Sequence, residues 1–378
     1  MKKHTSRVAG AVLALALITA ACGGTDEPAA PPAPAPAPAP AEPGEEECGL
    51  ELLGECIADA DLWEQAQAEG GLTLYTSLSE ARELVSLADF EAQTGLNVDY
   101  VRMTGAGLYE RVQTELAAGR VEADVIRDTD IALNIDHMDA GVYQPYCPRF
   151  VDLIPQDNVI RDCLIMSSLS PVVAISYNTE LVAAEDAPRT WEDMLDERWA
   201  GQIGIVEIGA GGSTWARDLY LRQVFGLEYW ERLAALQPTV VGTHGALTEA
   251  QARGEFAVAF NLPGSASLAM ENGAPLAIVF PPEGVPAYNL WIGMSSGATN
   301  VAAAQVFLNW TFSLAGQTAV GKAGDFPMRP DAPAPVLFNT VSPDPATANL
   351  YYTETFEEFV TLRPDWTAEW YDLIEDAR

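Results

Sequence analysis

Apolar and polar residues follow two periods along the chain, one typical of strands and one typical of helices. Three short apolar runs predict strands, at residues 72–77, 96–103 and 123–130. Helical spacing of apolar side chains follows at 79–95 and 107–119. Because strand and helix alternate, the pattern predicts an α/β fold with a parallel sheet covered by helices on both faces.

The alternation continues through the second half of the chain. Residues 170–182 predict a strand, and residues 190–208 predict a helix, a turn and a strand. Two further helices and a strand are expected within 229–263, strands within 275–298 and a helix within 300–321. About 320 residues follow position 57 (378 − 57 = 321), which is enough for two domains.

The first 21 residues are typical of an export signal. A basic start precedes 14 apolar or small residues, fewer than the roughly 20 that span a bilayer. The segment "ITAAC" resembles the lipobox of bacterial lipoproteins, although Thr19 stands where leucine is most frequent. We therefore expect residues 1–21 to be removed and Cys22 to carry a lipid anchor outside the cytoplasm, in the periplasm or at the cell surface. An ordinary secreted protein is the alternative.

Proline dominates the segment that follows, with eight prolines in residues 28–43. This composition favours polyproline II, which at about 3.1 Å per residue spans about 50 Å. We assign residues 22–57 to the lipidated N-terminus and a linker, either a disordered leader or a semi-rigid stalk.

Net charge narrows the range of partners. The full chain carries −34, and removal of Lys2, Lys3 and Arg7 leaves 17 − 54 = −37. Such a surface repels phosphate backbones, so binding to nucleic acid is excluded. The acidity is also compatible with a saline habitat.

Four cysteines follow Cys22, and an even number in an exported chain indicates disulfides. We expect the pairing of sequence neighbours, Cys48–Cys56 and Cys147–Cys163, while the other two connectivities stay open. No C-x-x-C occurs, which disfavours a structural zinc or thioredoxin-type site.

Several segments resemble one known family. "LTLYTSLSE", "EADVIRDTD", "AISYNTELV" and above all "PRTWEDMLDERWAGQIGI" are similar to segments of the extracellular solute-binding proteins of bacterial ABC importers, in the branch that contains the ferric-ion-binding proteins. The resemblance implies a periplasmic-binding-protein type 2 fold, with two Rossmann-like α/β lobes, crossing hinge strands and a ligand between the lobes. It places the first lobe at 58–174 plus 284–325, the second at 175–283, and a C-terminal helical segment at 326–378.

A glycine-rich loop before a helix is the first candidate site. Gly211, Gly212, Ser213 and Thr214 precede helical spacing, but no lysine completes a Walker A motif and Thr214 breaks the dinucleotide pattern G-x-G-x-x-G. Free N–H groups at a helix start still attract anions. The resemblance places this loop in the cleft, whereas an ordinary helix cap is the alternative.

Matching candidates lie in the first lobe. Thr104, Gly105 and Ala106 also precede a helix, and Thr76 and Ser77 end a strand, where open α/β sheets bind ligands. Ser77 and Glu80 also fit a capping box, which is the competing use of that serine.

Iron is the ligand that the resemblance raises, because ferric-ion binders of this branch use adjacent tyrosines with a carboxylate and sometimes histidine. The tyrosine positions read Asn261 to Gly264 here, and the first loop has no histidine. Tyr351 and Tyr352 lie too late in the chain. Asp128 or Asp130 could supply a carboxylate, and we expect His137 and His244 to be structural or exposed. We therefore expect no cofactor, with Fe³⁺ only at an atypical site.

The expected function is capture of a small solute, an oxyanion, a phosphonate-type compound or a ferric ion with an anion, and its delivery to a permease. A polyamine receptor is the alternative; it would use acids and aromatic side chains: Asp128, Asp130, Glu207, Trp215, Trp291 and Tyr288. A ligand-sensing lipoprotein is another. An enzyme is disfavoured, since only two scattered histidines, His137 and His244, follow residue 21 to serve as a base beside a nucleophile. We expect a monomer whose partners are the ligand, the permease subunits and, through the lipid, the membrane.

Overall fold

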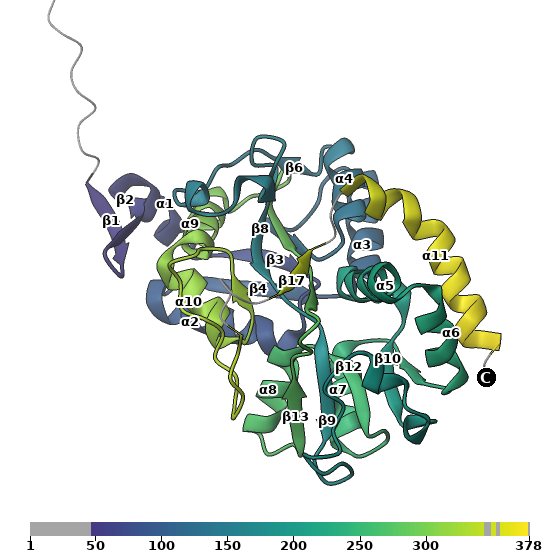
Figure 1. Ribbon diagram of the computed structural model, residues 1–378. Helices are drawn as coiled ribbons and strands as arrows, with labels where there is room; N and C mark the ends of the chain where they lie inside the picture. Colours follow the sequence, from purple (N-terminus) through teal and green to yellow (C-terminus); the bar gives the residue numbers. More distant parts are fainter. Residues whose placement is uncertain (1–46, 344–348, 353–355, 377–378) are drawn as a thin grey trace, which may run out of the picture. The chain divides into compact units, whose positions relative to one another are not determined.

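The computed structural model describes residues 47–343, 349–352 and 356–376 (Figure 1). The expected signal peptide, Cys22 and the proline-rich segment lie outside the described residues. Residues 46–378 form one unit, which contains everything described below. Among the helices described, none combines the length and the apolar character needed to cross a membrane.

Eight strands form the larger sheet, and we call the part of the protein built on it the first lobe. The order is β16-β8-β15-β5-β3-β4, with β6 paired to β15 and β7 paired to β8. β3 runs parallel to β4 and β5, as the alternation of strands and helices predicts, but β15 is antiparallel to β5 and β8. The strands are β3 (Gly71–Thr76), β4 (Asn97–Arg102), β5 (Val125–Asp128), β6 (Tyr143–Gln144), β7 (Val159–Ile160), β8 (Ile165–Ser170), β15 (Leu290–Ser295) and β16 (Phe326–Pro327).

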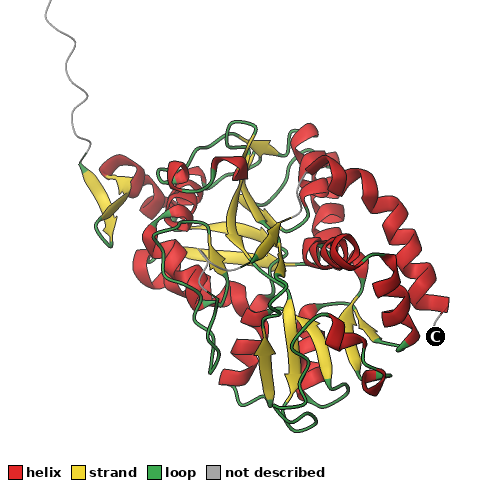
Figure 2. Ribbon diagram, in the orientation of Figure 1, coloured by secondary structure: helices red, strands yellow, loops and turns green. Residues whose placement is uncertain are grey.

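Five strands form the other sheet, which defines the second lobe (Figure 2). Its order is β11-β10-β12-β9-β13, with β10 parallel to β11 and β12, and β9 antiparallel to both of its neighbours. The chain passes from the first sheet to the second between β8 and β9, and returns between β13 and β15. The strands are β9 (Ala174–Asn178), β10 (Ile203–Val206), β11 (Thr239–Val241), β12 (Val258–Asn261) and β13 (Leu276–Val279).

Helices follow the strands in both lobes. α1 ends at a glycine in the left-handed conformation, Gly70 with φ 79°. The first lobe holds α1 (Ala60–Glu69), α2 (Glu80–Thr94), α3 (Gly105–Ala117), α4 (Ile131–Asp139), α9 (Val301–Phe312) and α10 (Leu314–Lys322). The second lobe holds α5 (Gly212–Phe225), α6 (Leu227–Ala235), α7 (His244–Ala252) and α8 (Pro263–Glu271).

Two of the tryptophans considered for ligand stacking are core residues instead. Trp215 is 1% exposed and packs in the core of the second lobe with Trp191 and Phe260. Trp291 is 7% exposed and lies in a core of the first lobe. Burial of aromatic area in the cores is therefore the role that these side chains fill.

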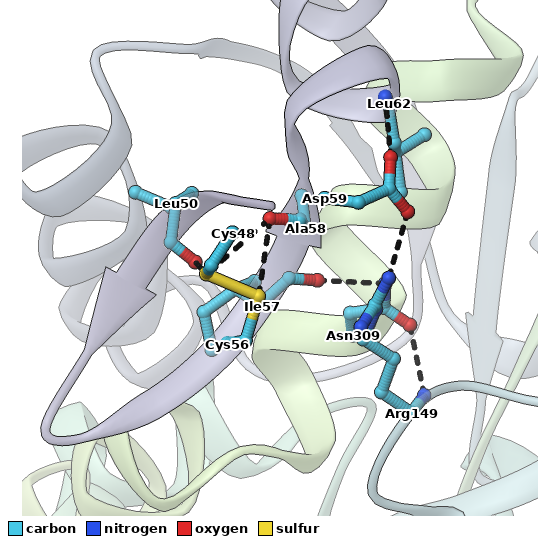
Figure 3. Close-up of a disulfide and its surroundings, with 9 residues drawn as sticks. All are labelled: Cys48, Leu50, Cys56, Ile57, Ala58, Asp59, Leu62, Arg149 and Asn309. Atoms are coloured by element: carbon cyan, nitrogen blue, oxygen red, sulfur yellow. Dashed lines mark hydrogen bonds and ion pairs between the residues drawn. A yellow bond between two sulfur atoms is a disulfide. The ribbon is translucent and has the colours of Figure 1, made fainter. Parts of the chain in front are cut away.

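Both expected disulfides are present, Cys48–Cys56 and Cys147–Cys163. The first closes the hairpin of β1 (Cys48–Leu52) and β2 (Glu55–Asp59), shown in Figure 3. The Asn309 side chain donates to the Ile57 carbonyl at 2.9 Å, and Ile57 is fully buried. Residues 48–57 are therefore part of the folded unit, so placing the end of the linker at residue 57 was wrong.

The C-terminal part of the chain is only partly helical. β16 joins the larger sheet, and β17 (Leu350–Tyr352) pairs in parallel with β14 (Val285–Ala287). Helix α11 (Phe356–Asp376) then runs from α4 to α6, as Figure 1 shows. The expectation of one helical segment over 326–378 was therefore wrong for 326–343 and 349–352, because β16 and β17 pair with other strands there and the remaining residues of these two ranges form no helix.

Candidate functional site

A cavity lies between the loops of the two lobes, with a volume of about 40 Å³, which is room for a few water molecules. Its walls come from the ends of β3, β4 and β5 in the first lobe and from the loops after β10 and β11 in the second. Two arginines are present among the lining residues and no aspartate or glutamate is. The lining residues therefore carry positive charge and no negative charge, although the whole chain is strongly negative.

Four helix N-termini contribute to these walls. Ser79 precedes α2, Thr104 precedes α3, Gly211 precedes α5 and Thr243 precedes α7. Thr104 and Thr243 cap their helices, by accepting from Gly107 N and Ala246 N, whereas no side chain caps α2 or α5. Because the first N–H groups of a helix lack intrahelical partners and carry partial positive charge, this arrangement favours an anion.

Arg82 provides a buried guanidinium in the first turn of α2. Its side chain pairs with Asp325, with Nε donating to Oδ2 at 2.9 Å, and Arg82 is fully buried. Burial opposes the charged form, but Asp325 and then Tyr288 hold the pKa of Arg82 above its usual value. Nη1 makes no hydrogen bond with any described residue. A buried guanidinium N–H without an acceptor is costly, so this atom is suited to a ligand oxygen.

Arg102 provides the second positive charge, from the last position of β4. Its Nε donates to the Leu78 carbonyl at 3.1 Å, and none of the described carboxylates forms an ion pair with it. Burial lowers the pKa of Arg102, while Glu80 acts in the opposite direction. An arginine stays protonated at neutral pH, so this side chain also attracts an anion.

Two uncharged donors complete the wall. His244 Nε2 lies 3.2 Å from Ser213 Oγ. Burial, followed by Arg217 and the two cavity arginines, lowers the pKa of His244 to about 3, so the imidazole is neutral. Burial raises the pKa of Tyr288 to about 12, which keeps its hydroxyl protonated. Both side chains can therefore donate a hydrogen bond without changing the charge of the cavity.

Four of the ten predicted ligand-binding residues line the cavity, namely Ser77, Thr104, Gly211 and Ser213. The other six do not lie among the lining residues: Thr76, Gly105, Ala106, Asp130, Gly212 and Thr214. The Thr76 and Thr214 side chains do not line the cavity, contrary to the prediction. The Thr76 hydroxyl donates to Glu83 at 2.6 Å, and the Thr214 hydroxyl donates to the Ile208 carbonyl at 2.7 Å.

Asp130 and Gly212 serve contacts between the lobes. Asp130 caps α4 and pairs with Arg363 of α11. Gly212 N donates to Thr129 Oγ1 at 3.2 Å, and a Cβ at Gly212 would lie 2.0 Å from the Thr129 carbonyl oxygen. Only glycine therefore lets the lobes approach this closely. Gly105 is buried beside Asp128, and Ala106 is exposed on α3.

The capping box predicted at Ser77 is wrong. α2 begins at Glu80 with Ser79 as its N-cap, and Ser77 Oγ accepts from Thr129 N at 3.1 Å instead. Seven lining residues that can donate or pair with an anion were not predicted to bind an oxyanion: Ser79, Arg82, Arg102, Thr129, Thr243, His244 and Tyr288. One signal was available for Arg102, a cation at the carboxyl end of a parallel strand.

The acids considered for a cation lie elsewhere. Asp128 is fully buried, and burial followed by the charge of Asp130 raises the pKa of Asp128 to about 7. Neither Asp128, Asp130 nor Glu207 lines the cavity. Over the ranges 47–343, 349–352 and 356–376, no three His, Cys, Asp or Glu side chains cluster as a metal site requires.

A family profile and a relative of known name both relate the chain to bacterial solute-binding proteins. Residues 86–349 match the profile of a family described as bacterial extracellular solute-binding protein. A probable ABC transporter periplasmic-binding protein, y4fP of Sinorhizobium fredii, is 23% identical over 266 residues, 65% of this chain and 71% of that one.

Two solved structures share the fold. AfuA from Actinobacillus pleuropneumoniae, a periplasmic binding protein with fructose-6-phosphate bound, has a TM-score of 0.67 and 21% identity, covering 81% of this chain and 99% of that one. Iron-bound HitA from Pseudomonas aeruginosa has a TM-score of 0.60 and 19% identity over 81% and 99%. The chain therefore shares the two-lobe fold of these two proteins.

Proposed function

Because the chain belongs to the family of bacterial extracellular solute-binding proteins, we propose that its cavity captures a small oxyanion, with phosphate monoesters and phosphonates as the ligand class. The observation that carries this proposal is the composition of the cavity wall. Arg82 and Arg102, together with four helix N-termini, face a space that no carboxylate lines. Guanidinium groups and helix starts are the recognition elements that phosphate oxygens require.

The comparisons leave the ligand class open. AfuA holds a sugar phosphate and HitA holds iron, so the shared fold accepts more than one ligand chemistry. The ligand class must therefore be inferred from the residues that line the cavity of this chain. Ferric iron needs several charged oxygen ligands, and among the lining residues Tyr288 is the one phenol and no carboxylate is present. A polyamine needs carboxylates, and no carboxylate lines this cavity.

Binding would need no chemical step on the ligand. In an open form the two lobes expose the cavity to solvent, and the anion then stabilises the arrangement in which the helix starts of both lobes meet it. This is hinge closure around a ligand. The cavity volume of about 40 Å³ means that a ligand larger than a small oxyanion must hold the lobes further apart than they are here.

Transport follows from the family, in which the binding protein delivers its ligand to a membrane permease. We place the protein outside the cytoplasm on that basis, and we propose that a lipid at Cys22 tethers it there. Replacing Cys22 by serine should release the protein from the membrane fraction into the soluble extracytoplasmic fraction. Retention of the Cys22→Ser variant in the membrane would contradict the tether.

Calorimetric titration tests the ligand class. The probes are inorganic phosphate, fructose 6-phosphate, a phosphonate, spermidine and chelated Fe³⁺. We expect the phosphate compounds to bind, and Arg102→Met to weaken their binding at least tenfold, because the variant keeps the apolar stem and loses the charge. Arg120→Met is the matched control, since Arg120 pairs with Glu122 on the surface. Binding of spermidine or Fe³⁺ without any phosphate compound would overturn the proposal.

A further inference from the structure

Helix α11 is anchored on the second lobe. Trp370 and Ile374 are buried in the core of that lobe, at 5% and 3% exposure. Arg222 of α5 pairs with Glu369 of α11, and its guanidinium lies 4.3 Å from the ring centre of Trp366. These contacts fix α11 to α5 and α6, so the helix should move with the second lobe as one body.

One side chain of α11 forms an ion pair with the first lobe. Arg363 Nη1 donates to Asp130 Oδ1 at 2.6 Å and lies 2.5 Å from Oδ2. Asp130 is fully buried and also accepts from Ala132 N and Leu133 N at the start of α4. On its other side, the Arg363 guanidinium lies 5.3 Å from the ring centre of Trp215 in the second lobe. Arg363 therefore bridges the two lobes.

The bridge lies directly behind the cavity. Asp130 follows Thr129, whose hydroxyl accepts the hydrogen bond from Gly212 N across the lobes. Trp215 lies two residues after Ser213, a lining residue of the second lobe. Any motion that separates the Thr129 and Gly212 loops must therefore also draw Arg363 away from Asp130, or pull α11 off the second lobe.

We propose that Arg363 is an interlobe lock, a positioning residue that stabilises the closed arrangement and so raises the affinity of the cavity for its anion. The proposal rests on the proposed function, in that ligand affinity depends on lobe closure. The Arg363–Asp130 pair is short, Asp130 is buried, and Arg363 Nη1 contacts both Asp130 oxygens. Under these conditions an ion pair contributes more to stability than an exposed surface pair does. If a substitution reduces the population of the closed state, the apparent affinity of the protein for its ligand falls in proportion.

The test combines a distance and an affinity. Labels introduced as non-natural residues at Glu110 on α3 and Glu249 on α7 report the separation of the lobes without disturbing the disulfides. In ligand-free protein, we expect Arg363→Met to shift the distance distribution toward longer values, because methionine keeps contact with Trp215 but cannot pair with Asp130. Inorganic phosphate should then bind about fivefold to tenfold more weakly than to the unsubstituted protein.

Matched variants separate a lock from loss of structure. Arg232→Met removes an arginine of α6 whose ion-pair partner, Glu192, also lies in the second lobe. It should leave the distance distribution unchanged and the affinity within about twofold of the parent. Asp130→Asn keeps an acceptor for the α4 cap and should reproduce Arg363→Met. The double variant should be no weaker than either single variant.

The outcomes distinguish the lock from the ligand assignment. If phosphate binds and Arg363→Met equals Arg232→Met in distance and affinity, the lock is wrong and the anion site stands. If no phosphate compound binds the parent protein, the ligand assignment fails, while the ligand-free distances still support the lock by lengthening in Arg363→Met or overturn it by staying unchanged.

Discussion

At the scale of single residues, burial sets which groups carry charge. His244 is neutral because it is buried beside arginines, and Arg82 keeps its charge because Asp325 is its partner. Asp128 shows the opposite case, since burial and the charge of Asp130 raise its pKa to about 7. The same physical terms therefore produce a positive cavity and, behind it, a carboxyl group that resists ionisation.

Asp128 makes stability depend on pH in a predictable direction. Its pKa in the folded protein, about 7, is above the ordinary value of 3.8, so between these values the folded state holds a proton that the unfolded state releases. This contribution to stability is complete below about pH 4 and is lost as pH rises through 7. Asp128→Asn removes the ionisation while keeping an oxygen for the Thr129 N–H, which Asp128 Oδ1 accepts at 2.7 Å.

We therefore expect Asp128→Asn to melt at nearly the same temperature as the parent at pH 4. At pH 8 the variant should melt at least about 2 °C higher, because only the parent then carries a buried charge. Thermal melting followed by circular dichroism at both pH values measures the difference. A difference that does not change with pH would show that Asp128 is ionised throughout.

The sequence shows which residue types are present, but not which of them reach the cavity. Gly211 and Ser213 of the predicted glycine-rich loop line the cavity, and the local pattern of glycine and hydroxyls before a helix was enough to select them. Arg82 was missed, since an arginine in the first turn of a helix usually faces water. Its burial depends on Asp325, which is 243 residues away along the chain, and no local pattern carries that information.

At the scale of elements, helix starts and strand ends do most of the positioning. Periodicity predicted the helices and strands around the site well, including α2, α3 and the parallel strands β3, β4 and β5. β15 falls within the strands expected at 275–298, whereas β8 was not predicted as a strand. The antiparallel direction of both was not predicted, because strand direction depends on the path of the chain between lobes and not on apolar spacing.

The Gly212→Ala variant tests whether ligand binding requires the lobes to close at the loop before α5. A methyl group there would lie 2.0 Å from the Thr129 carbonyl oxygen, so Gly212→Ala cannot adopt the present arrangement without a shift. We expect phosphate affinity to fall at least tenfold, because the closed state loses population. Titration calorimetry measures the affinity, and the melting temperature of ligand-free protein shows whether each lobe still folds.

Gly245→Ala is the matched control, since the nearest atom to a Cβ at Gly245, Thr243 Oγ1, lies 3.9 Å away. It lies in α7 and should bind phosphate like the parent. Equal affinity in Gly212→Ala and the parent would show that the Thr129–Gly212 contact is not needed for binding.

At the scale of the whole molecule, the net negative charge of the chain opposes the binding of an anion. The chain carries −34, so its long-range field repels anions, and recognition must come from short-range donors in the cavity. The two lobes bring those donors together from residues 77 to 288, and α11 holds both lobes through Arg363. The site is therefore a product of closure rather than of either lobe alone.

Native mass spectrometry of the protein purified without denaturation is the most direct test of this account. We predict that the parent protein retains a small oxyanion, identified by the mass it adds and by fragmentation, and that Arg102→Met prepared in parallel does not retain it. A retained polyamine or metal ion, or an anion kept equally by Arg102→Met, would contradict the assignment of the cavity.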